Sequence, residues 1–136
     1  MAKPSADLIR GIPMFSELDD SSVSQLADDF MEREFAEGQS LATEGEGGLN
    51  FFVVESGSVD VSVGGEVVAT LGPGASFGEV ALVDKSARSA TVTATSPMIA
   101  YALPIWSFRP FVEQRPELAW KLLEVLAERL RAANAR

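Results

Sequence analysis

The stretch FGEVALVDKSARSATV (residues 77–92) places an acidic residue directly after a glycine and a lone arginine among small residues. The overlapping pentapeptide GASFG (residues 74–78) matches G-x-S-x-G, the nucleophile elbow of serine hydrolases. An elbow serine needs a base to take its proton, and in that fold the base is histidine. Because the chain contains neither His nor Cys, we reject a hydrolase.

The absence of histidine and cysteine also argues against a metal site, since imidazole and thiolate are the usual ligands of zinc and other transition metals. Carboxylate ligands for Ca²⁺ or Mg²⁺ remain, but the sequence contains no D-x-D-x-D-G loop. The sequence also offers no pair of nucleophile and base. We therefore predict that the protein is not an enzyme and binds no metal.

Length and composition predict one soluble domain, residues 1–136. A chain of 136 residues can bury a core, and 46% hydrophobic with 23% charged residues is ordinary for globular proteins. No apolar run approaches the roughly 20 residues of a membrane span, and the N-terminus lacks a signal-peptide segment. We therefore predict a cytoplasmic protein without membrane insertion. Met1 and the compact ends favour a stand-alone protein, although an expressed fragment would look the same.

The charge balance argues against nucleic acid as a partner. The net charge of −9 repels polyanions, and the 11 Lys and Arg residues form no cluster. A small anion needs only one well-placed cation, so an anionic small molecule stays compatible with this composition.

The order of the patterns divides the chain into three segments. Residues 1–34 are predicted to be helical, with one helix opened by the capping-box spacing at residues 22–25. From about 35 to 104, short apolar runs alternate with glycine turns, and Gly64-Gly65 signals a hairpin. Many short strands at regular spacing indicate a sandwich or barrel. The predicted strands are 39–43, 51–55, 58–63, 66–71, 88–95 and 97–103.

Residues 105–136 are predicted to form a hinge and C-terminal helices. Pro116 opens a helix whose apolar residues recur along one face, and Arg129 falls at the edge of that stripe. No turn and second recognition helix follow, so we predict no helix-turn-helix. The stripe consists of Leu118, Leu122, Val125, Leu126 and Leu130.

This order of elements, with an acid-to-arginine loop in the middle, resembles the cyclic nucleotide-binding domain of kinase regulatory subunits, nucleotide-gated channels and bacterial catabolite-activator proteins. The resemblance covers most of the chain. It rests on EGE at 44–46, FF at 51–52, Gly57 before a valine-rich strand, FGEVAL at 77–82 and RSATV at 88–92. It implies an α+β fold, in which an eight-stranded antiparallel, jelly-roll-like β-roll is flanked by N-terminal helices and a C-terminal lid helix.

The segment quoted first corresponds to the phosphate-binding cassette of this family. Arg88 would take the phosphate, because guanidinium matches two phosphate oxygens and stays charged when buried. The Ser89 hydroxyl and the Ala90 N–H would donate to the remaining oxygens. Glu79 would accept a hydrogen bond from the ribose 2′-OH, and Gly78 would permit the tight turn.

A short helix over residues 78–83 would add free N–H groups and a positive dipole end to the anion site. Phe77, Val80 and Ala81 are therefore further candidates for ligand contact. Two departures from the family pattern, Ala87 in place of proline and Glu46 in place of aspartate, concern affinity rather than activity.

Several of these residues also have a structural interpretation. Val61 is the best candidate wall for the base and Ala69 a weaker one, although such residues more often belong to a core. Arg129 corresponds to an arginine that caps the base in some bacterial channel domains, but it also fits a helix-end charge or a salt bridge to the neighbours of Glu128. Without the resemblance, Arg88 also fits a surface arginine or a structural partner for Glu79 or Asp84.

The resemblance implies a receptor that binds a cyclic nucleotide and changes conformation to regulate an effector protein outside this chain. Ser89 favours cyclic AMP, with cyclic GMP as the alternative. Phosphate capture would pull the cassette inward and free a hinge around residues 104–116, so that the last helix closes over the base. Two alternatives stay open: a protein-interaction module that kept the fold without binding nucleotide, and a regulatory fragment of a channel, kinase or transcription factor.

Overall fold

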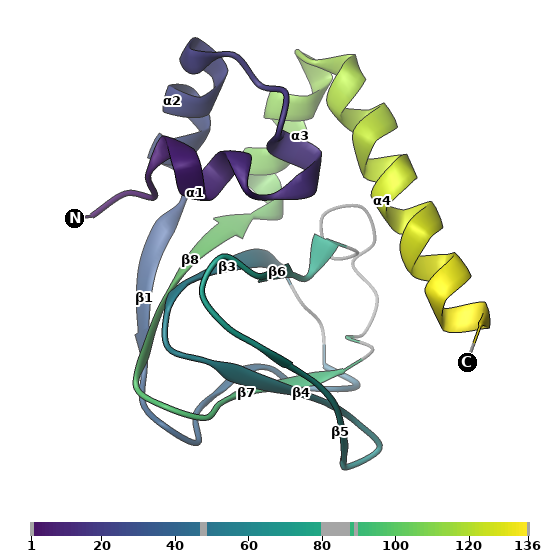
Figure 1. The fold of residues 1–136 in the computed structure, drawn as a ribbon. Coiled ribbons are helices and arrows are strands. Elements are labelled where there is room, and N and C mark those ends of the chain that lie inside the picture. Colours follow the sequence, from purple (N-terminus) through teal and green to yellow (C-terminus); the bar gives the residue numbers. More distant parts are fainter. Residues whose placement is uncertain (1, 47–48, 80–87, 89, 136) are drawn as a thin grey trace.

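Two four-stranded sheets form a β-roll, and the helices gather over one end of the roll and along one side (Figure 1). The computed structural model describes residues 2–46, 49–79, 88 and 90–135. One sheet has the order β1-β8-β3-β6 and the other the order β2-β7-β4-β5, and all pairs are antiparallel. This confirms the predicted α+β fold with its eight-stranded roll. The strands are β1 (Met31–Phe35), β2 (Ser40–Ala42), β3 (Asn50–Ser56), β4 (Val59–Val63), β5 (Glu66–Leu71), β6 (Ser76–Phe77), β7 (Thr91–Ala94) and β8 (Met98–Pro104).

Strand β3 packs into two cores at once, because its successive side chains point to opposite faces. Phe51 and Val53 pack against the helices, whereas Phe52 and Val54 face the opposite sheet. All four side chains are at most 4% exposed. A strand buried on both faces needs a continuous apolar run, which explains the sequence FFVV.

Two glycine turns shape the β4–β5 region. Gly64 (φ 60) and Gly65 (φ 82) connect β4 to β5 as the predicted hairpin, whose primed turn requires positive φ at both positions. Gly57 has φ 86, and a Cβ added there would lie 2.4 Å from the Met98 Cβ. Glycine at 57 is therefore a packing requirement as well as a turn signal.

The N-terminal helices cover the outer face of the β1-β8-β3-β6 sheet. They are α1 (Ala6–Arg10), the 3₁₀ helix η1 (Pro13–Phe15) and α2 (Asp20–Asp29). The predicted capping box at 22–25 is wrong, because the cap of α2 is Asp19. Its carboxylate accepts a hydrogen bond from the Ser22 N–H at 2.8 Å and satisfies one of the free donors of the first turn.

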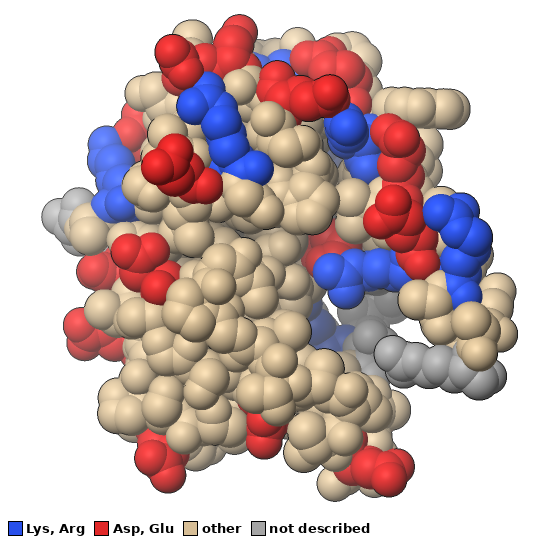
Figure 2. Space-filling view, viewed as in Figure 1, with Lys and Arg blue, Asp and Glu red and all other residues tan. Residues whose placement is uncertain are grey.

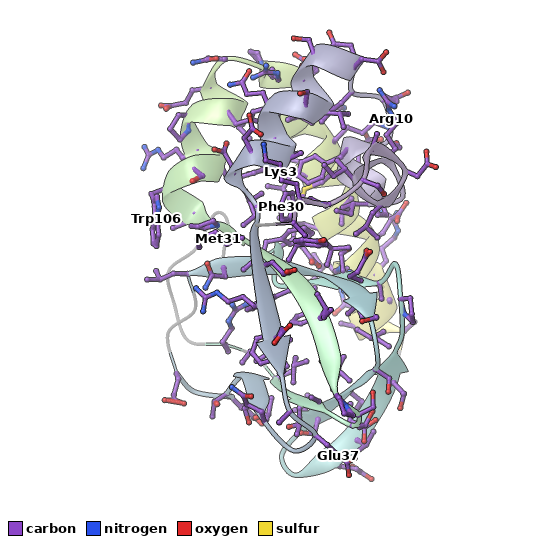
Figure 3. All side chains as sticks on the ribbon, turned by 90° about the vertical axis from the view of Figure 1, so that its left-hand side faces the viewer. Lys3, Arg10, Phe30, Met31, Glu37 and Trp106 are labelled. Atoms are coloured by element: carbon purple, nitrogen blue, oxygen red, sulfur yellow. The ribbon has the colours of Figure 1, made fainter. Side chains whose placement is uncertain are left out.

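The helical segment also ends before the predicted boundary at residue 34. Phe30 follows α2 and points into the interior, and β1 starts at Met31 (Figure 3). Strand β1 pairs along its whole length with β8, from Met31 opposite Ala102 to Phe35 opposite Met98. The sequence MEREF has no strong local strand pattern, so this strand is decided by its distant partner.

Helices α3 (Ile105–Glu113) and α4 (Pro116–Asn134) follow β8. Most of the region predicted as a hinge is therefore helix α3. Pro116 starts α4 as predicted, and α4 runs down beside the roll on the side of β6 (Figure 1). The predicted apolar stripe is only partly buried, because Leu118 and Leu122 are each 3% exposed whereas Leu130 is 62% exposed.

Arg115, at the corner between α3 and α4, ties this corner to α2. Its guanidinium donates to the Ser22 hydroxyl and the Gln25 amide oxygen, each at 2.9 Å. The same group lies 4.0 Å from the centre of the Phe111 ring, a cation–π contact. The start of α4 is therefore held against the N-terminal helices.

Candidate functional site

Arg88 is held through both its backbone and its side chain. Its N–H donates to the Glu46 carbonyl at 2.7 Å, and its own carbonyl accepts from the Gly45 N–H at 3.0 Å. Its Nη2 donates to the Asn50 carbonyl at 2.6 Å. The EGE motif thus fixes the chain at Arg88, while the start of β3 orients the guanidinium.

Gly78, directly after β6, makes room for this guanidinium. A Cβ added at Gly78 would lie 2.8 Å from Arg88 Nη1 and 3.0 Å from the Asn50 carbonyl oxygen. The backbone at Gly78 has φ 92, a conformation that residues with a Cβ rarely adopt. Gly78, predicted as a turn residue, therefore also leaves the space that the Arg88 guanidinium occupies.

Glu79 is a buried carboxylate that interacts with two arginines. It is 4% exposed, and its Oε1 forms an ion pair with the Nε of Arg129. Burial lowers the pKa of the Arg88 guanidinium, and the negative charge of Glu79 opposes that shift. A buried charge is tolerated when opposite charges compensate it, and two cations do so here.

Helix α4 reaches the site through Arg129. The Arg129 side chain is 56% exposed and the Glu79 side chain 5% exposed, so their ion pair lies at the rim of the site. The structure thus gives Arg129 a salt bridge, but to Glu79 rather than to the neighbours of Glu128 that the sequence suggested. Its contact with a base stays a prediction.

A cavity of about 220 Å³ lies beside Arg88. Thr43, Glu46, Asn50 and Phe52 line part of it. The Oδ1 of Asn50 is buried and has no hydrogen-bond partner among the described residues. Asn50 was not among the predicted site residues, because it contacts Arg88 through a backbone carbonyl that any residue type supplies.

The other predicted contacts lie in different environments. The Phe77 ring is 7% exposed and stacks on Phe52 with centroids 5.2 Å apart, so the ring serves the core between the sheets. Val61 packs against the same core, whereas its strand partner Ala69 is exposed.

Ala90 is partly buried before β7. The predicted contacts outside the described residues are Val80, Ala81 and Ser89.

Within the described residues, no group of three His, Cys, Asp or Glu side chains could hold a metal ion. No described helix is long and apolar enough to cross a membrane. The absence of a metal and of catalysis stays a prediction.

Gly78, Glu79 and Arg88 lie in the part of the chain that matches a protein family. The family model described as cyclic nucleotide-binding domain matches residues 32–115, from within β1 to the residue before α4. The chain belongs to this family. This family match confirms the predicted resemblance, and cyclic nucleotides are the ligand class that the family is named for.

In two curated relatives, the matching domain is one part of a larger protein. The chain is 36% identical over 96 residues to a cAMP-dependent protein kinase regulatory subunit from Yarrowia lipolytica, covering 71% of this chain and 26% of that protein. It is 34% identical over 128 residues to Glutaminase 2 from Bradyrhizobium diazoefficiens, covering 90% of this chain and 20% of that protein. The chain spans only a quarter to a fifth of these relatives, so a glutaminase name says nothing about catalysis by this domain.

Two solved structures share the fold over nearly the whole chain. The N-terminal domain of a transcriptional regulator from Streptomyces coelicolor A3(2) has a TM-score of 0.79 and 34% identity, covering 95% of this chain and 94% of that one. The catabolite activator protein of Thermus thermophilus has a TM-score of 0.81 and 31% identity, covering 90% of this chain and 60% of that one. The domain therefore shares its β-roll with regulators.

Proposed function

We propose that this domain binds cyclic AMP, with Arg88 at the cyclic phosphate and Glu79 at the ribose 2′-OH. The observation that carries the proposal is a buried carboxylate next to an arginine that is held over Gly78. A cyclic nucleotide presents one phosphate charge and one free ribose hydroxyl. It therefore needs a cation and an acceptor close together, and ionised Glu accepts without donating.

The remaining proposed contacts follow the family's cassette. Ser89 and the Ala90 N–H donate to phosphate oxygens, and the backbone of Val80 and Ala81 adds donors. Val61 lines the base side, because it lies on β4 at the edge of the core between the sheets. Ser89 supports cyclic AMP over cyclic GMP, as does the name of the Yarrowia relative.

The proposed output is a movement of α4. The Arg129–Glu79 ion pair joins this helix to the residue that would receive the ribose. A ligand that engages Glu79 adds contacts beside this ion pair, and it shifts the position of α4 by its difference in affinity for the two positions. The proposed effector is another surface or chain, which responds to the position of α4.

Calorimetric titration of the purified chain with cyclic AMP and cyclic GMP tests the proposal. We expect heat of binding with cyclic AMP and weaker binding with cyclic GMP. If neither nucleotide binds at millimolar concentration, the domain is instead a protein-interaction module that kept the fold. Equal affinity for both nucleotides would overturn the cyclic AMP preference but not the receptor function.

Replacing Gly78 with alanine is expected to weaken cyclic AMP binding about tenfold. The new Cβ would lie 2.8 Å from Arg88 Nη1, so the guanidinium must move, and positive φ costs alanine about 1–2 kcal/mol. Calorimetry measures the affinity, and thermal unfolding measures the strain. Gly74→Ala is the matched control, since Gly74 also has positive φ but nothing lies within 4 Å of its Cβ position. Equal affinity loss in both variants would contradict the steric role of Gly78.

Replacing Arg129 with alanine is expected to weaken cyclic AMP binding about three- to tenfold, since an exposed charged contact contributes about 1 kcal/mol. Our proposal is that Arg129 keeps the Glu79 carboxylate oriented while α4 closes the site. Calorimetric titration of Arg129→Ala with cyclic AMP measures the loss of affinity. Arg131→Ala is the control, because Arg131 is exposed in the same helix. Tighter binding by Arg129→Ala would show that the ion pair competes with the ribose instead.

A further inference from the structure

A groove separates the N-terminal helices from the start of α4, away from the nucleotide site. It encloses about 550 Å³, a size typical of binding clefts. We call it the α4 groove. Its apolar lining residues are Met14, Leu18, Leu118 and Trp120, and its charged ones are Glu17, Asp19, Glu117, Lys121 and Glu124. None of its lining residues belongs to the nucleotide site described above.

The floor of the α4 groove is apolar and one of its walls is an exposed tryptophan. Met14, Leu18 and Leu118 line it and are 4%, 9% and 3% exposed. Trp120 also lines it and is 68% exposed. Exposed tryptophan beside an apolar floor is typical of surfaces that anchor a partner's side chain.

The rim of the α4 groove is strongly acidic. Four carboxylates line it, with Lys121 as the one cation among its described lining residues. Glu17 already pairs with Lys121 at 3.0 Å, and this hydrogen bond raises the pKa of Lys121. Figure 2 shows acidic side chains gathered over the helical end and along the upper part of α4. The carboxylates are Glu17, Asp19, Glu117 and Glu124.

Two of these carboxylates are available to a partner. Glu117 and Glu124 are seven residues apart in α4, so they lie on one helix face, and both are exposed. Neither forms an ion pair with another described residue. Asp19, in contrast, is occupied by the Ser22 N–H.

We propose that the α4 groove docks a short basic segment of a partner protein, which places a large apolar side chain on the floor and cations on the rim. A second copy of this chain is a poor occupant, because its net charge is also −9. The exposed walls favour a protein segment over an enclosed small molecule. The proposal does not depend on nucleotide binding.

A short synthetic peptide tests this surface. Its leucines lie along one helical face and its lysines along the other, and a second peptide carries glutamate in place of lysine. Fluorescence anisotropy of labelled peptide is recorded with the purified chain at low salt and without nucleotide. We expect binding of the basic peptide only, weakened by added salt. No binding of the basic peptide, or equal binding of the acidic one, overturns the proposal.

Charge-reversal variants separate the groove from the overall acidity of the chain. The double variant Glu117→Lys, Glu124→Lys is expected to lower the affinity for the basic peptide about tenfold. Trp120→Ala is expected to lower it by a similar factor. The matched control is Glu113→Lys with Glu128→Lys, which changes the net charge equally at exposed helical positions outside the groove. Circular dichroism checks that each variant is folded. Equal weakening in the control pair would overturn the groove as the docking site, and it would leave the cyclic nucleotide proposal untouched.

Discussion

Replacing Arg88 with alanine is expected to weaken cyclic AMP binding by about 2–5 kcal/mol, or about 30-fold to several thousand-fold. The variant removes the cation proposed for the phosphate. It also removes one of the two positive charges that compensate buried Glu79. Without Arg88 the bound phosphate lacks its proposed cation and Glu79 is left with Arg129 alone, which accounts for the upper end of the range. Calorimetry on wild type and variant measures the difference.

Two controls separate ligand binding from stability. Arg88→Lys keeps the charge but lacks the planar fork, so we expect it to lose a large part of the affinity as well. Chemical denaturation of both variants then shows whether the fold survives. Unchanged cyclic AMP affinity in a folded Arg88→Ala chain would contradict the assigned phosphate contact.

Replacing Phe15 with alanine is expected to lower the free energy of unfolding by about 3–5 kcal/mol. Phe15 is 0% exposed and lies 6.3 Å, ring centre to ring centre, from both Phe51 and Phe108. It therefore joins η1 to strand β3 and to helix α3. A loss of this size is a large part of the roughly 5–15 kcal/mol that stabilises a typical domain.

An exposed aromatic residue provides the comparison for Phe15. Trp106 is 63% exposed and points away from the helices (Figure 3). Trp106→Ala is expected to change the unfolding free energy by no more than about 0.5 kcal/mol. Urea denaturation followed by circular dichroism measures both variants. A loss below about 1 kcal/mol for Phe15→Ala would show that the core between helices and sheet closes without this ring.

Elements with strong local signals agree between sequence and structure. Gly64-Gly65 fixes a hairpin because both residues must have positive φ, and Pro116 starts α4 because its missing N–H is harmless in a first turn. The predictions failed where a stronger partner, remote or local, decides. Strand β1 exists because β8 pairs with it, and the capping box at 22–25 was displaced by the stronger acceptor Asp19.

The candidate site shows the same division. The spacing of Gly78, Glu79 and Arg88 was visible in the sequence because these residues belong to one loop with a family pattern. The Asn50 carbonyl that receives Arg88 was not visible, since a backbone acceptor leaves no mark on residue type. Arg129 was a candidate from its correspondence to an arginine of some channel domains, and only the packing of α4 shows that it meets Glu79.

By itself, the sequence of this domain determined the family, the division into N-terminal helices, β-roll and C-terminal helix, and the candidate acid and arginine of the cassette. These properties follow from short-range rules: turn glycines, alternating apolar residues and fixed motif spacing. Only the tertiary structure decided the partners of the charged groups and the α4 groove, because each joins segments far apart in the chain. Such contacts depend on how whole elements pack, and no local pattern encodes them.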